Sequence, residues 1–534
     1  MNYKFVIAGL TALSLPLTLI CKEGNGHRKN VLFIAIDDLK PLLGCYGDPV
    51  AQTPNFDRLA RQGVIFNHAY CQQSISAASR ASLLTGMRPD RTKVYDLQTH
   101  IRKINPDVIT LPQYFKMNGY HSAGIGKIYD YRSVDASFDA PSWSEKFIDQ
   151  KKYLNKDYPQ PVMSAYLDDV MKYYQSDEVR KAYELKRAEA AALGLTGEEA
   201  DTWVINNIAI SNECVDVPDN AYLDGASTDG AIDFLENYDK EKPFFLAVGY
   251  KRPHLPFCAP EKYWNLYNRD DIPLAEFRSR AANSPDCAYH PCGELHKFLD
   301  IYDICEFNVK DNLVIPEAKQ KELIHAYYAC VSYIDAQIGR LIKTLKQQKL
   351  LKNTIIVVWG DHGWHLGDHS LWNKHTNFEN ATHVPLIIFD PDIRHREIDV
   401  PVEFLDVYPT LCSLCGLERP SHIEGENLEC VMKGQESQSS LKPYAVSQYP
   451  RKGMMGYTFR DQRYRYTVWV DWKKRKANPE IIRYEELYDY LEDPLETENH
   501  IDDPVYSKAL QHMRTYWKDY ISRQAEYPST LNID

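Results

Sequence analysis

The sequence lacks several features that would place the chain in a common class. The formal net charge of its 534 residues is −12, so it lacks the broad basic surface that non-specific nucleic-acid binding requires. Its 12 cysteines form no paired Cys-x-x-Cys motifs of the kind that bind structural zinc. Internal repeats are absent, and no apolar run beyond the N-terminus is long enough to span a bilayer. These absences favour a globular protein with no nucleic-acid partner.

The N-terminus is typical of an export signal. Lys4 supplies a positive charge, residues 5–20 are apolar, and Cys21 follows directly. We therefore expect a signal peptide over residues 1–21 and an exported protein, in the periplasm or on the outer membrane of a bacterium. The position of Cys21 leaves lipidation open, and that anchor is the only membrane contact that we expect.

Short apolar runs alternate with helical patterns along the chain. Polar or turn residues bound each run, and continuous apolar runs between helices predict a mostly parallel sheet that is covered on both faces. The expected fold class is therefore α/β. The predicted strands are residues 31–36, 121–126, 244–249, 355–359 and 384–389, and the predicted helices are residues 55–62, 77–84, 111–118, 228–237 and 318–348.

Changes of composition divide the chain further. One polar, Lys/Glu/Ala-rich segment and one Pro/Asp-rich segment have the character of insertions, which often shape the pocket at the mouth of an α/β sheet. Near the C-terminus, a strand pattern at 464–470 and a helical pattern at 507–521 predict a smaller α+β subdomain. The expected boundaries are 27–440 for a catalytic domain, 145–215 and 260–315 for its insertions, and 441–534 for the subdomain.

Carboxylates follow two of the predicted strands. Asp37 and Asp38 come directly after the first strand, and Asp361 and His362 come after the fourth. In open α/β sheets the carboxyl ends of strands face the ligand crevice, and adjacent carboxylates there repel each other unless a cation neutralises them. Oxygen donors suit a hard cation such as Ca²⁺. Adjacent aspartates also occur as plain loop caps, so these pairs alone leave both interpretations open.

A polar segment opens the second predicted helix. Residues 76–86 read Ser-Ala-Ala-Ser-Arg-Ala-Ser-Leu-Leu-Thr-Gly, with Arg80 about one helical turn after Ser76. The N-terminus of a helix is an anion site. The whole string resembles the signature of the sulfatase family, in which Cys or Ser, any residue, Pro or Ala, Ser and Arg are followed by Leu-Thr-Gly.

The resemblance runs from about residue 29 to residue 500 and looks closest to the iduronate 2-sulfatase branch of that family. It implies an alkaline-phosphatase-like fold, with a mostly parallel sheet flanked by helices, and the hydrolysis of sulfate esters. The segments that carry it are residues 37–41, 44–48, 85–90, 244–250, 253–257, 361–364, 381–386, 447–451 and 464–470.

The resemblance implies that Ser76 is oxidised to formylglycine (3-oxoalanine) by an anaerobic-type sulfatase-maturing enzyme before export. A serine sulfate ester would be a stable dead end. A hydrated aldehyde has two hydroxyls, so one can attack sulfur and the other can drive the expulsion of sulfate. The resemblance also implies a Ca²⁺ site made of Asp37, Asp38, Asp361, His362 and the group at position 76, in which the ion would polarise a sulfate oxygen.

Five further residues take their expected roles from the same resemblance. Arg80 would hold the formylglycine, Lys127 and Lys374 would contact the sulfate, and His254 would protonate the leaving alcohol. Asp130 stands where the iduronate-type pattern Gly-Lys-x-x-His has its histidine. A carboxylate there can act as a base toward the hydrated aldehyde, but it also repels sulfate.

The expected substrate is a sulfated oligosaccharide, in which an exo-acting enzyme removes the 2-O-sulfate of a hexuronate, saturated or unsaturated, from heparan, heparin, chondroitin or dermatan sulfate. The sugar carboxylate requires cations. Two alternatives stay open: a phosphate or phosphonate monoester hydrolase of the same superfamily, and a catalytically silent glycan-binding lipoprotein. The candidate substrate contacts beside the two lysines and His254 are Tyr95, His100, Arg102, Trp364 and His375.

Overall fold

The computed structural model describes residues 28–160, 174–302, 304, 312 and 315–526. The expected signal peptide with Cys21 lies outside the described residues. Parts of the two expected insertions also lie outside them.

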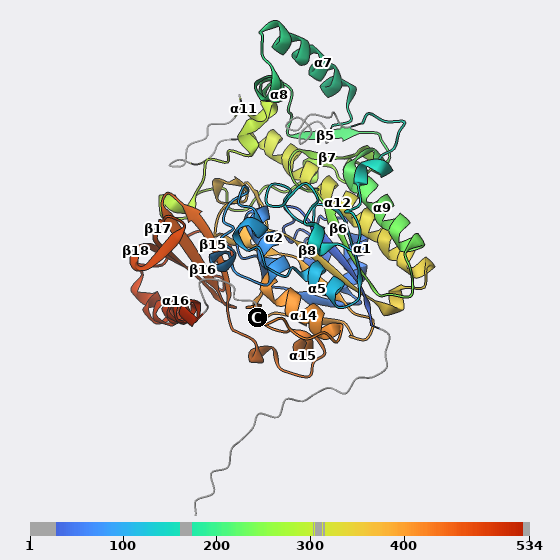
Figure 1. Ribbon diagram of the computed structural model, residues 1–534. Coiled ribbons are helices and arrows are strands. Elements are labelled where there is room, and N and C mark those ends of the chain that lie inside the picture. The colour runs from blue at the N-terminus through green and yellow to red at the C-terminus, as the bar shows by residue number, and fades with distance from the viewer. Residues whose placement is uncertain (1–27, 161–173, 303, 305–311, 313–314, 527–534) are drawn as a thin grey trace, which may run out of the picture.

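A seven-stranded sheet forms the centre of the protein (Figure 1). Its strand order is β13-β2-β12-β8-β1-β6-β4. The four strands from β8 to β4 are parallel, whereas β12 runs antiparallel to both of its neighbours. The predicted mostly parallel α/β sheet is therefore confirmed. The strands are β1 (Asn30–Ile36), β2 (Val64–Phe66), β4 (His121–Gly126), β6 (Phe244–Tyr250), β8 (Thr354–Gly360), β12 (Leu386–Phe389) and β13 (Arg396–Ile398).

Helices cover both faces of this sheet, which explains why the strands are continuously apolar. In β1, Leu32 and Ile34 pack in one core with α1 (Pro54–Ala60), α9 (Leu223–Asn237) and α12 (Glu317–Gln347). Val31 and Phe33, which alternate with them, pack in a second core. The helices of this second face are α2 (Ser76–Thr85), α5 (Leu111–Met117) and α14 (Val407–Leu414).

Each of the five predicted helices is present, but one predicted strand is divided. The run at 384–389 forms β12 and, before it, the end of β11 (His383–Val384), which pairs with β3 (Ala69–Tyr70) in a different sheet. Pro385 stands between the two strands and has no N–H to donate. The period of the apolar pattern does not reveal such a division.

The first expected insertion contains α7 (Asp177–Ala192), α8 (Gly197–Asn206) and β5 (Asn212–Val215), which pairs with β7 (Phe257–Pro260). In Figure 1, α7 and α8 project from the top of the molecule. The short remaining elements are α3 (Pro89–Thr92), α4 (Ile101–Ile104), α10 (Glu261–Trp264), α11 (Leu299–Tyr302), α13 (Glu379–Thr382), α15 (Glu429–Met432), β9 (His365–Leu366), β10 (Trp372–Asn373) and β14 (Val402–Glu403).

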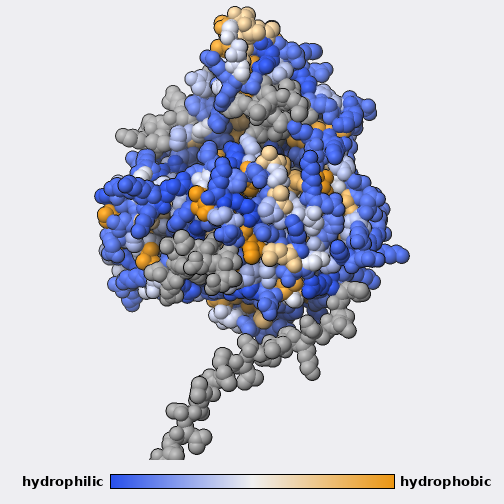
Figure 2. All heavy atoms as spheres, in the orientation of Figure 1, coloured by the Kyte–Doolittle hydropathy of each residue, from blue (hydrophilic) through white to orange (hydrophobic). Residues whose placement is uncertain are grey.

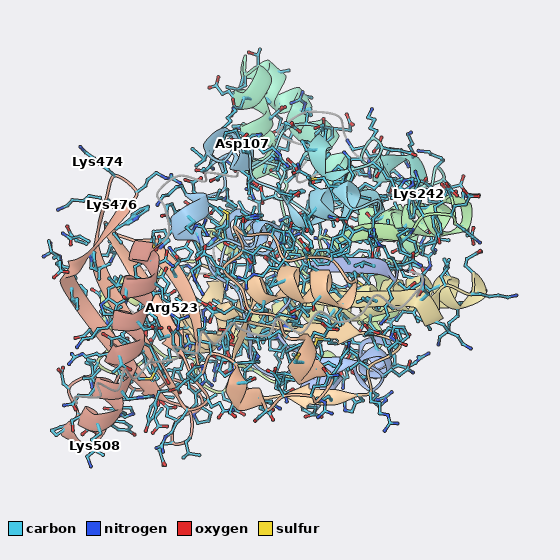
Figure 3. All side chains as sticks on the ribbon, turned by 60° about the horizontal axis from the view of Figure 1, so that its bottom comes forward. Asp107, Lys242, Lys474, Lys476, Lys508 and Arg523 are labelled. Atoms are coloured by element: carbon cyan, nitrogen blue, oxygen red, sulfur yellow. The ribbon has the colours of Figure 1, made fainter. Side chains whose placement is uncertain are left out.

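The C-terminal part is a separate layer. A four-stranded antiparallel sheet packs against α16 (Ser507–Glu526) around its own apolar core, and the expected α+β subdomain is confirmed. Figure 3 shows Lys474 and Lys476 at the tip of the β17–β18 hairpin, with Lys508 and Arg523 on α16. The strands are β15 (Ala445–Arg451), β16 (Met454–Arg460), β17 (Tyr464–Lys473) and β18 (Lys476–Asp489).

The surface in Figure 2 is mostly hydrophilic, with apolar residues in small scattered groups. Such groups are normal on a folded protein. Among the described residues, a helix able to cross a membrane is absent.

Candidate active site

Strands β1 and β8 bring two carboxylates together at one edge of the central sheet. The strands are parallel and in register at Ile36 and Gly360, so the residues that follow, Asp37 and Asp361, emerge side by side. The N–H of Asp361 donates to the carbonyl of Ile36 at 3.0 Å. The sequence placed these aspartates at strand ends, and the parallel pairing makes them neighbours.

Strands β4 and β6 add basic residues to the same edge. Gly126 has a φ of 76°, and a Cβ there would lie 2.0 Å from the carbonyl oxygen of Gly249, so only glycine allows this approach. The next N–H, of Lys127, donates to that carbonyl at 3.1 Å. Beyond β6, the chain leads into the loop that carries His254.

The aspartates form a compact cluster with a histidine. The ligand atoms of Asp37, Asp38, Asp361 and His362 all lie within 4.8 Å of one another, and all four residues are buried. The Nδ1 of His362 lies 3.1 Å from the carbonyl of Gly363. A carbonyl only accepts, so Nδ1 carries the proton and the lone pair of Nε2 faces the carboxylates. This donor set fits a divalent cation.

Charge crowding shifts the pKa values in this cluster. Burial raises the pKa of Asp38 well above its usual range; Lys374 opposes the shift and Asp37 adds to it. Burial and Asp37 also raise the pKa of Asp361. Burial acts on Asp37 too, but the ammonium group of Lys127 and a nearby guanidinium outweigh it and hold the pKa of Asp37 well below its usual range. A bound cation relieves such repulsion.

Ser76 is the first residue of α2 and touches this cluster. Its Oγ donates to Oδ1 of Asp37 at 3.1 Å and lies 3.1 Å from Nε2 of His362. Lys127 Nζ donates to the same Oγ at 3.5 Å. The side chain is almost fully buried, yet it forms part of the cavity wall. The hydroxyl therefore stands where the cluster, the helix N-terminus and the cavity meet.

Arg80, one turn further along α2, organises the carboxylates. Its Nε donates to Asp361 at 2.8 Å and its guanidinium also donates to Asp37 at 3.1 Å. The remaining donors reach the carbonyls of Lys127 and Ile128. We expected Arg80 to hold the group at position 76. Its described hydrogen bonds go to the two aspartates and the two carbonyls, and its expected contact with formylglycine stays a prediction.

A cavity of about 490 Å³ opens onto the cluster, a size typical of a small-ligand site. Cationic groups dominate its wall although the whole chain is acidic. They come from the residues that follow β4, β6 and β10, from the second insertion and from the end of β15, and they prepare the cavity for an anion. The cations are Lys127, Arg132, Lys251, Lys297, Lys374 and Arg451.

Lys374 and His254 share a carboxylate at the cavity wall. Lys374 Nζ lies 3.0 Å from Oδ1 of Asp38 and 3.1 Å from Oε1 of Glu294, above the ring of Trp364 at 4.9 Å. His254 Nε2 lies 3.1 Å from the same Glu294 oxygen. Burial lowers the pKa of His254 and Lys374 lowers it further, whereas Glu294 raises it. The carboxylate of Glu294 therefore favours the protonated imidazole.

Comparison with known proteins identifies the family to which this site belongs. The family model described as Sulfatase matches residues 29–417. The chain belongs to the sulfatase family. A second model, described as N-sulphoglucosamine sulphohydrolase, C-terminal, matches residues 367–522. The predicted family and its alkaline-phosphatase-like fold are thus confirmed, and the protein is a sulfuric ester hydrolase.

Relatives of this sulfatase extend over nearly the whole chain. Mouse iduronate 2-sulfatase is 33% identical, with 91% of this chain and 93% of the relative covered. A Delta 4,5-hexuronate-2-O-sulfatase of Bacteroides thetaiotaomicron is 26% identical, with 95% and 92% covered. A solved structure described as a 2-O GAG sulfatase superposes with a TM-score of 0.62 at 23% identity, with 94% and 93% covered, and shows the shared fold. Sulfatases use formylglycine and a divalent metal, for which the Asp/His cluster offers donors.

In this sulfatase, the carboxylate of Asp130 is paired with two cations. Arg132 donates two hydrogen bonds of 2.8 Å to this carboxylate, and Lys127 Nζ lies 3.8 Å from Oδ2 of Asp130. Burial opposes ionisation, but these cations lower the pKa of Asp130 to about 2. So acidic a group is a poor proton acceptor at neutral pH. Lys127 and Arg132 therefore balance the charge of Asp130 before sulfate arrives, and a role of Asp130 as a base stays a prediction.

We expect Asp130→Asn to destabilise the sulfatase by about 2 kcal/mol near neutral pH, because the pKa of this carboxyl is lowered on folding. The contribution is fully present above the unfolded pKa of about 4 and is lost as the pH falls toward 2. Thermal melts from pH 7 to pH 3 measure it. The matched control is Asp107→Asn, at an exposed aspartate labelled in Figure 3. A penalty no larger than that of the control would contradict the assignment.

Several other expected substrate contacts lie elsewhere. The carboxylate of Asp139 binds Arg102, and His100 caps α4 through its ring; neither residue lines the cavity. The hydroxyl of Tyr95 donates to a nearby aspartate. Trp364 is fully buried beneath Lys374 and does not line the cavity. Of these five candidates, His375 alone lines the cavity.

The structure also shows cavity residues to which the sequence assigned no role. Glu294, His290 and Lys297 come from the irregular second insertion, which has no periodicity to interpret. Arg451 and Tyr449 lie in a segment that carried the family resemblance. That resemblance was the one signal in the sequence that pointed to either of them.

Proposed function

We propose that the protein removes the 2-O-sulfate of a hexuronate at the end of a glycosaminoglycan-derived oligosaccharide. The observation that carries the proposal is the joining of two features in one cavity. Ser76 and Asp37, one member of the Asp/His cluster, form its floor, and a wall of cations surrounds them. Relatives named for iduronate and hexuronate 2-O-sulfate esters support the choice of sugar.

Asp37, Asp38, Asp361 and His362 would hold the metal, and Ca²⁺ is the ion that we propose. Three carboxylates give the hard oxygen donors that Ca²⁺ prefers. The lone pair of His362 Nε2, whose ring is fixed by the Gly363 carbonyl, supplies the fourth donor. The ion would supply Lewis-acid polarisation of a sulfate oxygen.

Ser76 is the residue that we propose is matured to formylglycine, by an anaerobic-type maturing enzyme before export. When present, that group supplies a hydrated aldehyde as nucleophile. The chain contributes its placement. The N-terminus of α2 and the ammonium group of Lys127 lie at the Oγ, and both favour negative charge at this position. The carboxylates of the Asp/His cluster would oppose that charge unless they hold the metal.

His254 and the two buried lysines complete the proposed reaction centre. Lys127 and Lys374 would bind the sulfate oxygens and neutralise their charge. His254, when protonated, would give the proton of Nε2 to the oxygen of the departing alcohol. Its Nδ1 lies 2.5 Å from the carbonyl of Leu255, which fixes the ring with Nε2 facing the cavity. Glu294 supports the charged form of the ring.

Arg451 is the group that we propose for binding the uronate carboxylate. Its guanidinium stacks on Tyr449 with 5.1 Å to the ring centroid, and one nitrogen donates to the carbonyl of His375. The buried Nε has no hydrogen-bond partner among the described residues. A buried, unsatisfied guanidinium N–H in a cavity wall fits a planar carboxylate.

We expect Arg451→Met to raise KM for a 2-O-sulfated uronate disaccharide about 10- to 100-fold, which corresponds to about 1.4–3 kcal/mol for a charged hydrogen bond. The same disaccharide with its carboxylate reduced to an alcohol tests the contact. On the reduced disaccharide, the KM of wild type should rise to that of the Arg451 variant, because the contact between Arg451 and the carboxylate is missing in both cases. Lys297→Met, which removes an exposed cation of the same cavity, is the matched control. An equal loss on both substrates in the Arg451 variant would contradict the assignment.

Sulfate release from defined disaccharides tests the proposed function. Mass spectrometry first confirms two hydrogens lost at Ser76, and the substrates carry one sulfate at uronate O2 or glucosamine O6. We expect release from the 2-O ester alone, abolished by a calcium chelator and restored by Ca²⁺. Release from the 6-O ester alone would refute the uronate assignment. Faster turnover of phosphate or phosphonate esters would favour the superfamily alternative, and binding without turnover would favour a silent glycan-binding lipoprotein.

Export remains part of the proposal. The signal pattern at residues 1–21 and the possible lipid anchor at Cys21 support a periplasmic or outer-membrane location. Such a location also suits a substrate that reaches the cell from outside.

A further inference from the structure

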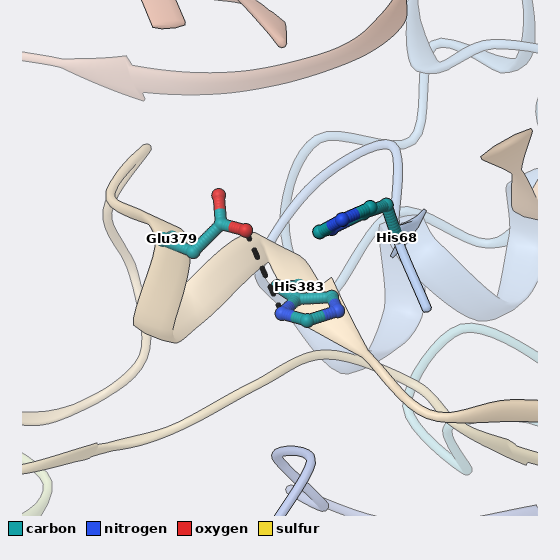
Figure 4. A group of neighbouring side chains, drawn as sticks. All are labelled: His68, Glu379 and His383. Carbon is teal, nitrogen blue, oxygen red and sulfur yellow. Dashed lines mark ion pairs between the residues drawn. The ribbon is translucent and has the colours of Figure 1, made fainter. Parts of the chain in front are cut away.

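A second cluster of metal-ligating side chains lies outside the catalytic cavity. Ligand atoms of His68, Glu379 and His383 lie within 4.8 Å of one another. Figure 4 shows the two imidazoles and the carboxylate facing a common space, with the pair between Glu379 and His383 dashed. None of the three residues lines the cavity of the proposed reaction. The function proposed above therefore leaves this cluster unexplained.

Local geometry forces the three side chains together. His383 is paired with Tyr70 in the antiparallel β11–β3 ladder, so their side chains lie on one face. His68 lies in the turn directly before β3, and its ring centroid is 5.8 Å from that of His383. Glu379 is four residues before His383, and α13 occupies the turn between them, so it returns to the same side.

Two acceptors in this cluster face each other, and a buried ring nitrogen of a third residue has no hydrogen-bond partner among the described residues. His383 Nε2 lies 2.8 Å from the carbonyl of Asn67, and because a carbonyl only accepts, the proton of the neutral ring is on Nε2. Its Nδ1 is then an acceptor, 3.5 Å from Oε1 of Glu379. The Nδ1 of His68 is buried and has no hydrogen-bond partner among the described residues. The two facing acceptors, His383 Nδ1 and Glu379 Oε1, therefore lack a shared positive centre.

The spacing matches what a metal imposes. Two ligands at bond lengths of about 2.0–2.1 Å in a tetrahedral zinc site lie about 3.4 Å apart, close to the separation of His383 and Glu379. Metal-bound histidine usually donates its other N–H to a carbonyl, and metal-bound carboxylates are themselves hydrogen-bonded. The carbonyl of Asn67 and the hydroxyl of Tyr70, which donates to Oε1 of Glu379 at 2.8 Å, provide both features.

The charges around the cluster allow a cation. Arg460 and Arg465 approach Glu379 through its other oxygen, Oε2. Arg465 also pairs with Glu496 at 3.1 Å, so two carboxylates match the two guanidinium groups. The side chains of Glu379 and His383 are 19% and 17% exposed, which lets an ion enter from solvent.

We propose that His68, Glu379 and His383 bind a first-row transition-metal ion such as Zn²⁺, in a structural site distinct from the catalytic cluster. Two imidazoles and one carboxylate suit such an ion better than Ca²⁺. Through Glu379 the ion is linked to Arg460 on β16 and Arg465 on β17. The bound ion would therefore stabilise the contact between the edge of the catalytic domain and the C-terminal sheet.

The test uses the full chain in saturating Ca²⁺, which occupies the catalytic cluster, and Co²⁺ followed by Zn²⁺ as probes. We expect one equivalent of Co²⁺ to bind with the d–d absorption of a four- or five-coordinate ion, and Zn²⁺ to displace it and raise Tm. His68→Asn should weaken binding at least about tenfold and abolish the rise in Tm, while sulfate-ester hydrolysis stays within about twofold. His512→Asn, on exposed α16, should behave like wild type.

Equal Co²⁺ spectra in the His68 variant and wild type, or no specific band in wild type, would overturn the proposal. X-ray absorption of zinc-loaded wild type gives a second measurement that does not depend on a folded variant. Two imidazoles per zinc support the site. One imidazole, as the catalytic cluster with His362 would give, overturns it. The Co²⁺ spectra, the Tm and the X-ray absorption do not depend on sulfate release, so the two proposals are tested separately.

Discussion

Replacing Asp38 by asparagine is expected to lower kcat/KM for a sulfate ester at least about 10³-fold, equivalent to about 4 kcal/mol of transition-state stabilisation. Asp38 contributes one of the four ligand atoms of the catalytic cluster, and a neutral amide binds a hard cation more weakly than a carboxylate does. Calorimetric titration should show a matching loss of Ca²⁺ affinity, and wild type in chelator should fall to the activity of the variant.

The same substitution should leave the Tm of the metal-free protein unchanged or higher. The fold raises the pKa of Asp38 by burial and by the nearby Asp37. An ionised carboxylate with a raised pKa opposes folding above its unfolded pKa, and this penalty disappears as the pH falls. After the substitution, Lys374 keeps Glu294 as a partner.

Asp392→Asn is the matched control, because Asp392 is exposed and pairs with Lys29 at the opposite end of the sheet. It should keep both full activity and Ca²⁺ affinity. If Asp38→Asn retains a tenth or more of the wild-type activity, Asp38 is not a ligand of the catalytic metal.

His254→Asn is expected to reduce hydrolysis of a sugar sulfate about 10²- to 10⁴-fold, the usual contribution of a general acid. A sugar alkoxide needs a proton as it leaves, whereas a nitrophenolate departs without one. The loss on an aryl sulfate should therefore stay below about tenfold. The ratio of kcat values for the two esters separates a protonation defect from a general loss of binding.

The control for this ratio is His395→Asn, at a histidine that is 44% exposed, which should leave both esters at wild-type rates. Equal losses on the two esters in His254→Asn would show that His254 binds sulfate and does not protonate the alcohol. Burial lowers the pKa of His254. The protonated form, which can act as the acid, should therefore predominate only at low pH unless bound substrate raises that pKa. The sugar-sulfate rate should therefore fall as the pH rises.

Much of the catalytic floor follows from the sequence because its signals are local. Apolar runs buried on both faces identify parallel strands, and parallel strands place the residues after them at one edge. The strand pattern by itself therefore predicts that Asp37, Asp38 and Asp361 lie close together. The helix that begins at Ser76 is equally local, and the family signature assigned it a function.

The tertiary structure alone decided the partners of these residues. The sequence offers Asp130 as a possible base, and the structure shows that Arg132 folds back onto Asp130 and balances its charge. His100 and Arg102 lie near matched motifs, yet they cap and brace a short helix. Glu294 reaches the cavity from an insertion without periodic pattern. Periodicity and motif spacing describe how a residue relates to its own strand or helix, whereas these contacts depend on how distant loops pack, which no local pattern encodes.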